Sequence, residues 1–396
     1  MSAIFLAPVY IVFCLYILRW VIRYMTACHH FFSRIYVRVI VYMIYAFLAS
    51  SILIAFLMPH CQFQRFIQLV SNYWLGTVMY ILMVAVIVDV IRLFAKRTSF
   101  RGKDFLFSRK GFVCVGSLCI AAVIMFSAAG IYGASNIRTT EYNITVNKSG
   151  GKLESLHIAL VADLHLGYST GCTQMKKMTD IINDMHPDIV LIAGDIFDNE
   201  YEALDAPEKL SRILSGIRSR YGVFACYGNH DIQERILAGF TFGRSEEKKS
   251  DPRMDEFLKL SDITLLQDEG VVIDDSFYLY GRPDRRKPGG NIKNRKTPDE
   301  ITAKADISKP VIVIDHEPAE LQELADAGVD IDLCGHTHDG QIFPGNLTIN
   351  LFWENACGYM RKGNMHNIVT SGTGVFGPAM RVGTRSEVCD ITVDFN

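Results

Sequence analysis

Four long hydrophobic runs dominate the first third of the chain. They cover roughly residues 3–22, 39–59, 69–91 and 112–133. Each run is about 20 residues long, the length at which an α-helix crosses a hydrocarbon core of ~30 Å. Helices of a soluble domain carry a polar stripe on one side, and these runs do not. The pattern therefore predicts a transmembrane region of about four helices over residues 1–133.

The pattern changes beyond residue 133. We expect a linker and a first strand over residues 134–152, and a separate domain over residues 153–396. In that domain short apolar runs end in polar turns, at 156–162, 188–193, 223–227, 310–314 and 331–334. The first two runs flank a stretch with apolar residues at helical spacing, which predicts a β-α-β unit with parallel strands. The fold class is therefore α/β, in which ligand sites lie at the carboxyl ends of strands.

Charge separates the same two regions. Residues 1–140 hold 13 Lys and Arg but two acids, which leaves 27 basic and 40 acidic residues for the remainder. Basic residues cluster between the first and second runs and between the third and fourth, which places those connections in the cytoplasm. We therefore expect a multi-pass plasma membrane protein whose second domain is extracytoplasmic. An acidic domain lacks the basic footprint of nucleic-acid binding, so no nucleic acid is expected as a partner.

One segment of the acidic domain, residues 282–309, is polar and basic at its start. It is either a solvated loop or a patch that meets an anionic substrate or lipid head groups. The oligomeric state is left open.

Side chains that can bind metals follow five of the apolar runs. They are Asp163 and His165, Asp195, Asn229 beside His230, His316, and His336 with His338. Asp-x-His and His-x-His place two side chains on one face of an extended segment. Carboxylates and neutral imidazoles suit divalent manganese, iron or zinc. The candidates are too many for one metal ion but suit two. Two ions about 3.5–4 Å apart can stabilise both the attacking and the leaving oxygen of a phosphoryl displacement.

Taken in order, these motifs resemble those of the calcineurin-like metallophosphoesterase superfamily, and in particular its bacterial membrane-associated branch. The motifs are D-x-H at 163–165, G-D-x-x-D at 194–198, G-N-H-D at 228–231, His316, and G-H-T-H at 335–338. The resemblance implies a four-layer αββα sandwich with two mixed sheets. Most relatives have Gly where this chain has Asp339, which adds a negative charge beside the site.

The resemblance also implies a role for each residue. Asp163, His165 and His338 would hold one metal, and Asn229, His316 and His336 would hold the other. Asp195 would bridge the two ions. His230 would act as the acid that protonates the leaving oxygen, and Asp231 would orient His230. The expected cofactors are two divalent metal ions, with manganese first and iron or zinc as alternatives.

The implied function is metal-dependent hydrolysis of a phosphoester by a hydroxide that bridges two metals. A phosphodiester or pyrophosphate is the expected substrate. Because the helices hold the site near a lipid bilayer, we expect this substrate to be lipid-linked or part of the cell envelope. The alternative is a non-catalytic membrane sensor that binds metal or phosphate. Transport by the helices is disfavoured, because Asp89 is the one acid within the four runs.

Overall fold

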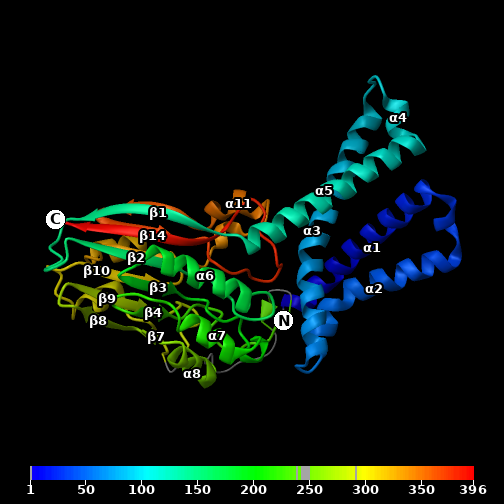
Figure 1. Ribbon diagram of the computed structural model, residues 1–396. Helices are drawn as coiled ribbons and strands as arrows, with labels where there is room; N and C mark the ends of the chain where they lie inside the picture. Colours follow the sequence, from blue (N-terminus) through cyan, green and yellow to red (C-terminus); the bar gives the residue numbers. More distant parts are fainter. Residues whose placement is uncertain (1, 238–239, 242–249, 290–291) are drawn as a thin grey trace. The chain divides into compact units, whose positions relative to one another are not determined.

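The computed structural model describes residues 2–237, 240–241, 250–289 and 292–396 (Figure 1). Its contacts divide these residues into two compact units. The first holds the chain up to Ile131, together with two short strands and Gly377–Met380. The second holds the other described residues, beginning at Tyr132.

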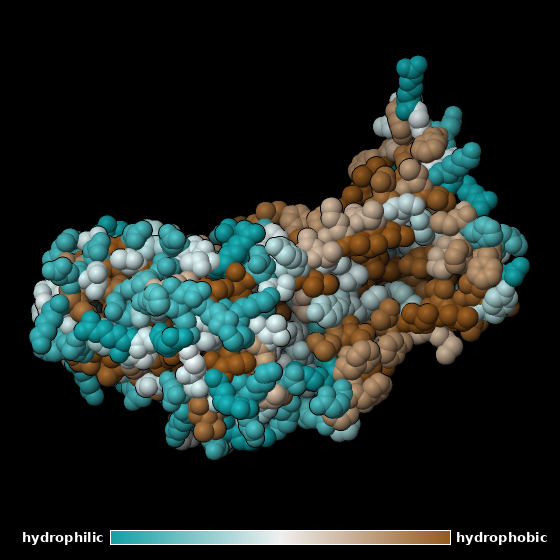
Figure 2. Space-filling model, viewed as in Figure 1, coloured by the Kyte–Doolittle hydropathy of each residue, from teal (hydrophilic) through white to brown (hydrophobic). Residues whose placement is uncertain are grey.

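The first unit is built from long apolar helices. They are α1 (Ser2–Cys28), α2 (Ile35–Leu57), α3 (Gln62–Arg97) and α5 (Arg109–Ser135), with the short α4 (Lys103–Phe107) and the 3-10 turn η1 (His30–Ser33) between them. Each of the four long helices contains a stretch long and apolar enough to cross a membrane, which confirms the prediction of four. Their hydrophobic side chains are largely exposed, as expected for helices that lipid surrounds (Figure 2). Strands β5 (Ile236–Leu237) and β6 (Phe240–Thr241) form an antiparallel pair in this unit.

Polar side chains on these helices bond across to neighbouring helices. The Tyr45 hydroxyl donates to the carbonyl oxygen of Cys14 at 2.8 Å. The Tyr16 hydroxyl donates to Asp89 Oδ2 at 2.7 Å, so the one acid of the hydrophobic runs has a partner. Such bonds between α1 and its neighbours satisfy groups that lipid could not.

The second unit contains two six-stranded sheets. The first has the order β1 (Ile137–Val146), β14 (Ser386–Phe395), β2 (Ser155–Val161), β3 (Ile189–Ala193), β4 (Val223–Cys226) and β7 (Ile263–Leu265). The second has the order β12 (Gly358–Lys362), β13 (Met365–Val369), β11 (Ile331–Cys334), β10 (Val311–Asp315), β9 (Phe277–Arg282) and β8 (Glu269–Ile273). The pairs β14–β2, β12–β13 and β8–β9 are antiparallel and the others are parallel, so both sheets are mixed.

Helices cover the outer face of each sheet. The first sheet packs against α6 (Cys172–Met185), α7 (Pro207–Leu214) and α8 (Pro252–Leu260), and the second against α9 (Pro298–Thr302) and α10 (Leu321–Asp326). Between the sheets lies an apolar core that includes Leu160 and Leu191 from one sheet and Ile312 and Leu333 from the other. The four-layer αββα sandwich is therefore confirmed. Short helical turns complete the unit, namely η2 (Tyr201–Ala203), η3 (His338–Gly340), α11 (Gly345–Thr348) and η4 (Ile349–Leu351).

The β2-α6-β3 unit shows how the sequence pattern produces this arrangement. Met175, Met178 and Ile182 recur at helical spacing and are fully buried against the first sheet. His186 ends α6 in the left-handed conformation, and the chain then enters β3, which pairs with β2 in parallel. The polar turns that follow β2, β3 and β4 meet those that follow β10 and β11 at one end of the sandwich.

Candidate metal centre

The turns after five strands carry the predicted metal ligands. Many of these residues have positive φ, an uncommon conformation for residues other than glycine. They are Asp163 (φ 52°), His165 (φ 42°), Asp195 (φ 51°), His336 (φ 73°) and His338 (φ 50°). Such conformations cost energy and cluster at functional sites, where the surrounding structure enforces them. Here all five residues lie in the turns that follow β2, β3 and β11.

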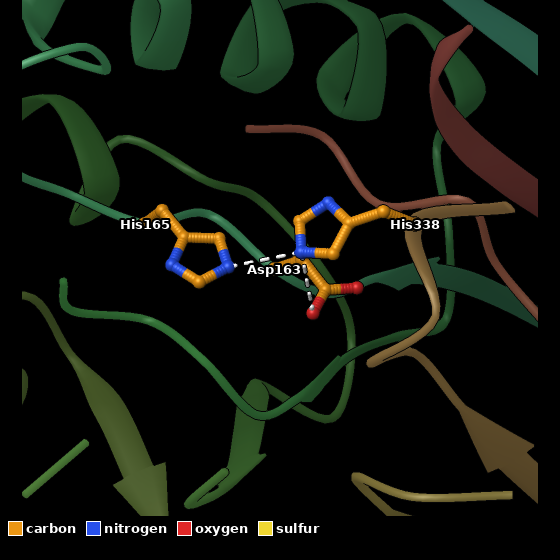
Figure 3. A group of neighbouring side chains, drawn as sticks. All are labelled: Asp163, His165 and His338. Carbon is orange, nitrogen blue, oxygen red and sulfur yellow. Dashed lines mark hydrogen bonds and ion pairs between the residues drawn. The ribbon is translucent and has the colours of Figure 1, made fainter. Parts of the chain in front are cut away.

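One cluster consists of Asp163, His165 and His338 (Figure 3). The Nε2 atoms of His165 and His338 face one another at 3.0 Å. His338 Nε2 is 3.6 Å from Asp163 Oδ1. All three residues are buried. Two imidazole nitrogens and a carboxylate that converge in this way form a donor set suited to a divalent cation.

A second cluster is centred on His316. Its Nε2 atom is 3.1 Å from Asp195 Oδ2, 3.1 Å from Asn229 Oδ1 and 3.1 Å from His336 Nδ1. The other ring nitrogen, Nδ1, donates a hydrogen bond to the carbonyl oxygen of Ala193 at 2.9 Å. A bond of this kind fixes the tautomer of a metal-binding histidine and leaves Nε2 free for the metal.

Asp195 joins the two clusters. Its Oδ2 atom, which is close to His316, is also 3.7 Å from His165 Nε2. Its Oδ1 atom accepts a hydrogen bond from the backbone N–H of His230 at 2.7 Å, which fixes the direction of the carboxylate. All seven predicted ligands therefore lie in two adjacent clusters around one carboxylate. This largely buried set of oxygen and imidazole donors fits a pair of divalent ions.

His230 lies beside the first cluster, and its ring contacts Asn199 and Phe376. Its Nδ1 atom is hydrogen-bonded to Asn199 Oδ1. The ring packs against Phe376, with 4.6 Å between the ring centroids. Asn199 is itself buried, and its amide donates to the carbonyl oxygen of Ile232 at 3.3 Å. Asn199 was not predicted, although it directly follows the G-D-x-x-D motif and could have been suspected on that ground.

Asp231 lies beneath the turn that carries Asn229 and His230. Its carboxylate accepts hydrogen bonds from the backbone N–H groups of Gly228 at 2.7 Å and Phe197 at 2.8 Å. It thus supports the backbone of the turn, whereas Asn199 contacts the His230 ring.

Burial controls the charge of these groups. It raises the pKa of Asp163 to about 6 and that of Asp231 to about 7, because a buried carboxylate loses its hydration. The same loss lowers the pKa of His336 to about 3 and that of His230 to about 4. Neutral imidazole is the form that binds metals, so burial favours the binding state of His336.

Arg381 is a buried residue of the site to which the sequence assigned no role. It is 1% exposed. Its Nη2 donates to the carbonyl oxygens of Ser371 at 2.6 Å, Gly374 at 2.8 Å and Gly372 at 3.2 Å. It also lies 3.2 Å from His338 Nδ1, while Nη1 donates to the His338 carbonyl oxygen at 3.3 Å. Burial lowers its pKa to about 10, so the guanidinium stays charged at neutral pH and ties the 371–374 loop to a predicted metal ligand.

In the basic segment 282–309, Arg285 and Arg286 are exposed, as expected for a solvated loop, whereas the side chains of Arg282 and Arg295 are buried. Arg282 Nη1 pairs with Asp315 Oδ2 at 2.9 Å, and Arg295 Nη1 pairs with Asp315 Oδ1 at 3.0 Å. Both arginines also pair with Glu320, at 2.6 and 2.7 Å. These two side chains are buried rather than solvated or aimed at a substrate. They fix Asp315, the residue before His316.

Comparison with known proteins agrees with this geometry. Residues 156–340 match the family model described as calcineurin-like phosphoesterase. The second unit is therefore a calcineurin-like metallophosphoesterase domain, and the resemblance seen in the motifs is confirmed.

Relatives of this chain occur in animals and bacteria. A "Transmembrane protein with metallophosphoesterase domain" of Danio rerio is 27% identical over 69% of this chain and 62% of the relative. An "Uncharacterized metallophosphoesterase" of Helicobacter pylori is 28% identical over 72% of each chain. The "UDP-2,3-diacylglucosamine pyrophosphatase LpxG" of Chlamydia trachomatis is 24% identical over 58% of this chain and 80% of that protein. The match thus spans less than two thirds of the fish relative.

Proposed function

We propose that this membrane protein hydrolyses a phosphoester, a phosphodiester or a pyrophosphate, with the help of two divalent metal ions. The observation that carries the proposal is the position of Asp195 Oδ2. This atom lies 3.1 Å from His316 Nε2 and 3.7 Å from His165 Nε2. A single carboxylate oxygen between two sets of imidazoles is the arrangement that a bridged pair of ions requires. We expect manganese, with iron or zinc as alternatives.

Each cluster would hold one ion, and Asp195 would bridge them. Two bound cations would lower the pKa of a shared water and offset the negative charge of the phosphate. The ligands fix where the phosphate can lie, because most of them are buried and enter from rigid strand ends. His230 would face the leaving oxygen with Nε2, since Nδ1 is bonded to Asn199 Oδ1. Burial lowers the pKa of His230 to about 4, so the ring would serve as the acid once the negative charge of a bound phosphate raises that pKa and Nε2 gains a proton. Asp231 would act indirectly, by holding the turn on which His230 lies.

Two further observations support a substrate at the membrane. Four helices suited to spanning a bilayer precede the catalytic domain. One relative is named a UDP-2,3-diacylglucosamine pyrophosphatase, which supports a lipid-linked pyrophosphate. The distribution of basic residues between the helices supports an extracytoplasmic position for the domain at the plasma membrane.

The test is an assay of the purified full-length chain, loaded with manganese, on a chromogenic phosphodiester and on a lipid pyrophosphate. Asp195→Asn should lose bound metal and activity together. His230→Asn should keep its metal and lose about 10²–10⁴-fold in kcat, the usual contribution of a general acid. His186→Asn is the matched control, because His186 lies in the turn after α6, outside the site, with φ 53°, which Asn tolerates. A wild-type rate no higher than those of the two site variants would refute hydrolysis and favour the sensor.

A further inference from the structure

The segment after the G-H-T-H motif exposes an unusual group of apolar side chains. Leu347 is 66% exposed, Leu351 is 80% exposed and Phe352 is 77% exposed. They lie on α11, on η4 and directly after it. Isolated exposed hydrophobic residues are ordinary, whereas a contiguous group of large ones marks an interaction surface. We call Leu347, Leu351 and Phe352 the apolar edge.

The apolar edge is fixed to the metal centre at both of its ends. At its start the backbone of Gly345 lies against that of Gly340, so closely that a Cβ on Gly340 would be 2.4 Å from the Gly345 carbonyl carbon. At its end the ring of Trp353 meets the ring of His336 edge-on, with 5.1 Å between centroids. Gly340 and His336 belong to the same turn of metal ligands. The apolar edge therefore stays close to the metal centre.

The last turn of α5 belongs to the second unit and contacts residues that lie next to the same metal centre. Gln174 Nε2 donates to the carbonyl oxygen of Ala134 at 2.8 Å and to that of Thr373 at 3.0 Å. A Cβ on Gly133 would be 2.6 Å from the carbonyl oxygen of Arg381, the residue that holds His338. The chain thus leaves a membrane-spanning helix within contact distance of the residues behind the metal site. In Figure 1, α11 lies at this same end of the sandwich, where β1 and β14 begin.

We propose that the apolar edge inserts into the interfacial layer of the lipid bilayer and presents the metal centre to phosphoesters carried on membrane lipids. This inference rests on the proposed function and names its substrate class. The bilayer is the occupant we commit to, because α5, a helix suited to crossing it, ends in contact with residues next to the metal centre. Other exposed hydrophobic residues of the described part of the sandwich lie elsewhere, such as Leu260 on α8, Val272 on β8 and Ile307 in the turn before β10.

The first test measures insertion without any need for activity. Full-length Phe352→Trp and Val272→Trp variants are placed in phosphatidylcholine vesicles whose acyl chains carry bromine, a quencher of tryptophan fluorescence. Val272 is the control because it is 54% exposed on β8. Both variants share the native Trp20, Trp74 and Trp353 as background. We expect the added fluorescence at position 352 to fall at least twofold relative to unbrominated lipid, and that at position 272 to stay constant.

The second test measures selectivity. Phe352→Ser and Leu351→Ser are compared with Val272→Ser for the ratio of two rates, hydrolysis of a lipid pyrophosphate in vesicles and hydrolysis of a soluble chromogenic phosphodiester. The ratio should fall at least tenfold in the first two variants and stay at the wild-type value in Val272→Ser.

The outcomes separate the two proposals. Equal quenching at positions 352 and 272 overturns insertion, and a change of oligomeric state in Phe352→Ser would then identify a contact between copies of the chain instead. Quenching at position 352 with an unchanged rate ratio overturns the link to lipid substrates. If neither substrate is hydrolysed, the proposed function fails, while the quenching experiment still decides whether the apolar edge inserts.

Discussion

Replacement of Arg381 by Met is the sharpest test of how the metal centre is held. Met retains an unbranched side chain that can fill the buried space, but it removes the guanidinium. The carbonyl oxygens of Ser371, Gly372 and Gly374 and the backbone oxygen of His338 then lose their donor. These groups are buried around Arg381, so water cannot readily replace it.

The magnitude follows from the kind of bond that is lost. A hydrogen bond to a charged group contributes about 1.5–3 kcal/mol, and each buried group left unsatisfied costs about 1–3 kcal/mol. These values do not add within one network, so the total should be about 4 kcal/mol, near the upper end for a single substitution. At about 4 kcal/mol, a domain of this size should lose roughly 8–16 °C in Tm. Because His338 also loses its orienting partner, metal affinity should fall about 10–100-fold.

The assay is thermal unfolding of the full-length protein in detergent, with and without manganese, combined with elemental analysis. Arg361→Met is the control, because Arg361 is exposed on β12, where its Nε donates to the carbonyl oxygen of Gly363 at 3.2 Å. Its Tm should stay within about 2 °C of wild type, the range of an ordinary surface substitution. If Arg381→Met matches that control in Tm and in bound metal, Arg381 does not hold the centre.

Three other substitutions test separate parts of the site. Asp195→Asn should reduce bound metal from two ions to at most one per chain, and elemental analysis that still finds two would argue against a bridge. Asn199→Ala should lower kcat about 10–100-fold, as loss of an orienting partner does, with metal content unchanged; a lower metal content would instead indicate collapse of the site. Gly340→Ala should destabilise the protein more than Gly363→Ala, by calorimetry, because Gly340 has φ 73° and no space against Gly345, whereas Gly363 has φ 58° and nothing within 4 Å.

Much of the catalytic domain could be predicted from the sequence, because apolar runs of strand length are each followed by a polar turn. Short apolar runs marked the strands β2, β3, β4, β10 and β11, and each run ended in a candidate ligand. In a mainly parallel arrangement the carboxyl ends of strands gather at one end, so residues far apart in the chain could be expected to meet. The seven candidate ligands could be singled out from this and from the chemistry of their side chains.

The supporting residues could not be predicted in the same way. Arg381 is separated from His338 by 43 positions, and no periodicity or motif connects them. The Arg282 and Arg295 side chains lie in a stretch whose composition is typical of a solvated loop. Their burial depends on Asp315, at the end of β10, and Glu320, directly before α10, which neutralise them. A buried charge is recognisable only when its partner in space is known.

The last turn of α5 and the candidate metal centre belong to one packed unit, although one is the end of a helix and the other a set of turns. Helix α5 runs without interruption to Ser135, yet its contacts change from the first unit to the second between Ile131 and Tyr132. Beyond that point Gly133 lies against the backbone of Arg381, and Arg381 in turn holds His338. Only a residue without a side chain fits at that contact, so the position of the helix end is set by the same backbone that supports the metal ligands. The last turn of α5 and the residues around the candidate metal centre therefore form one packed part of the second unit.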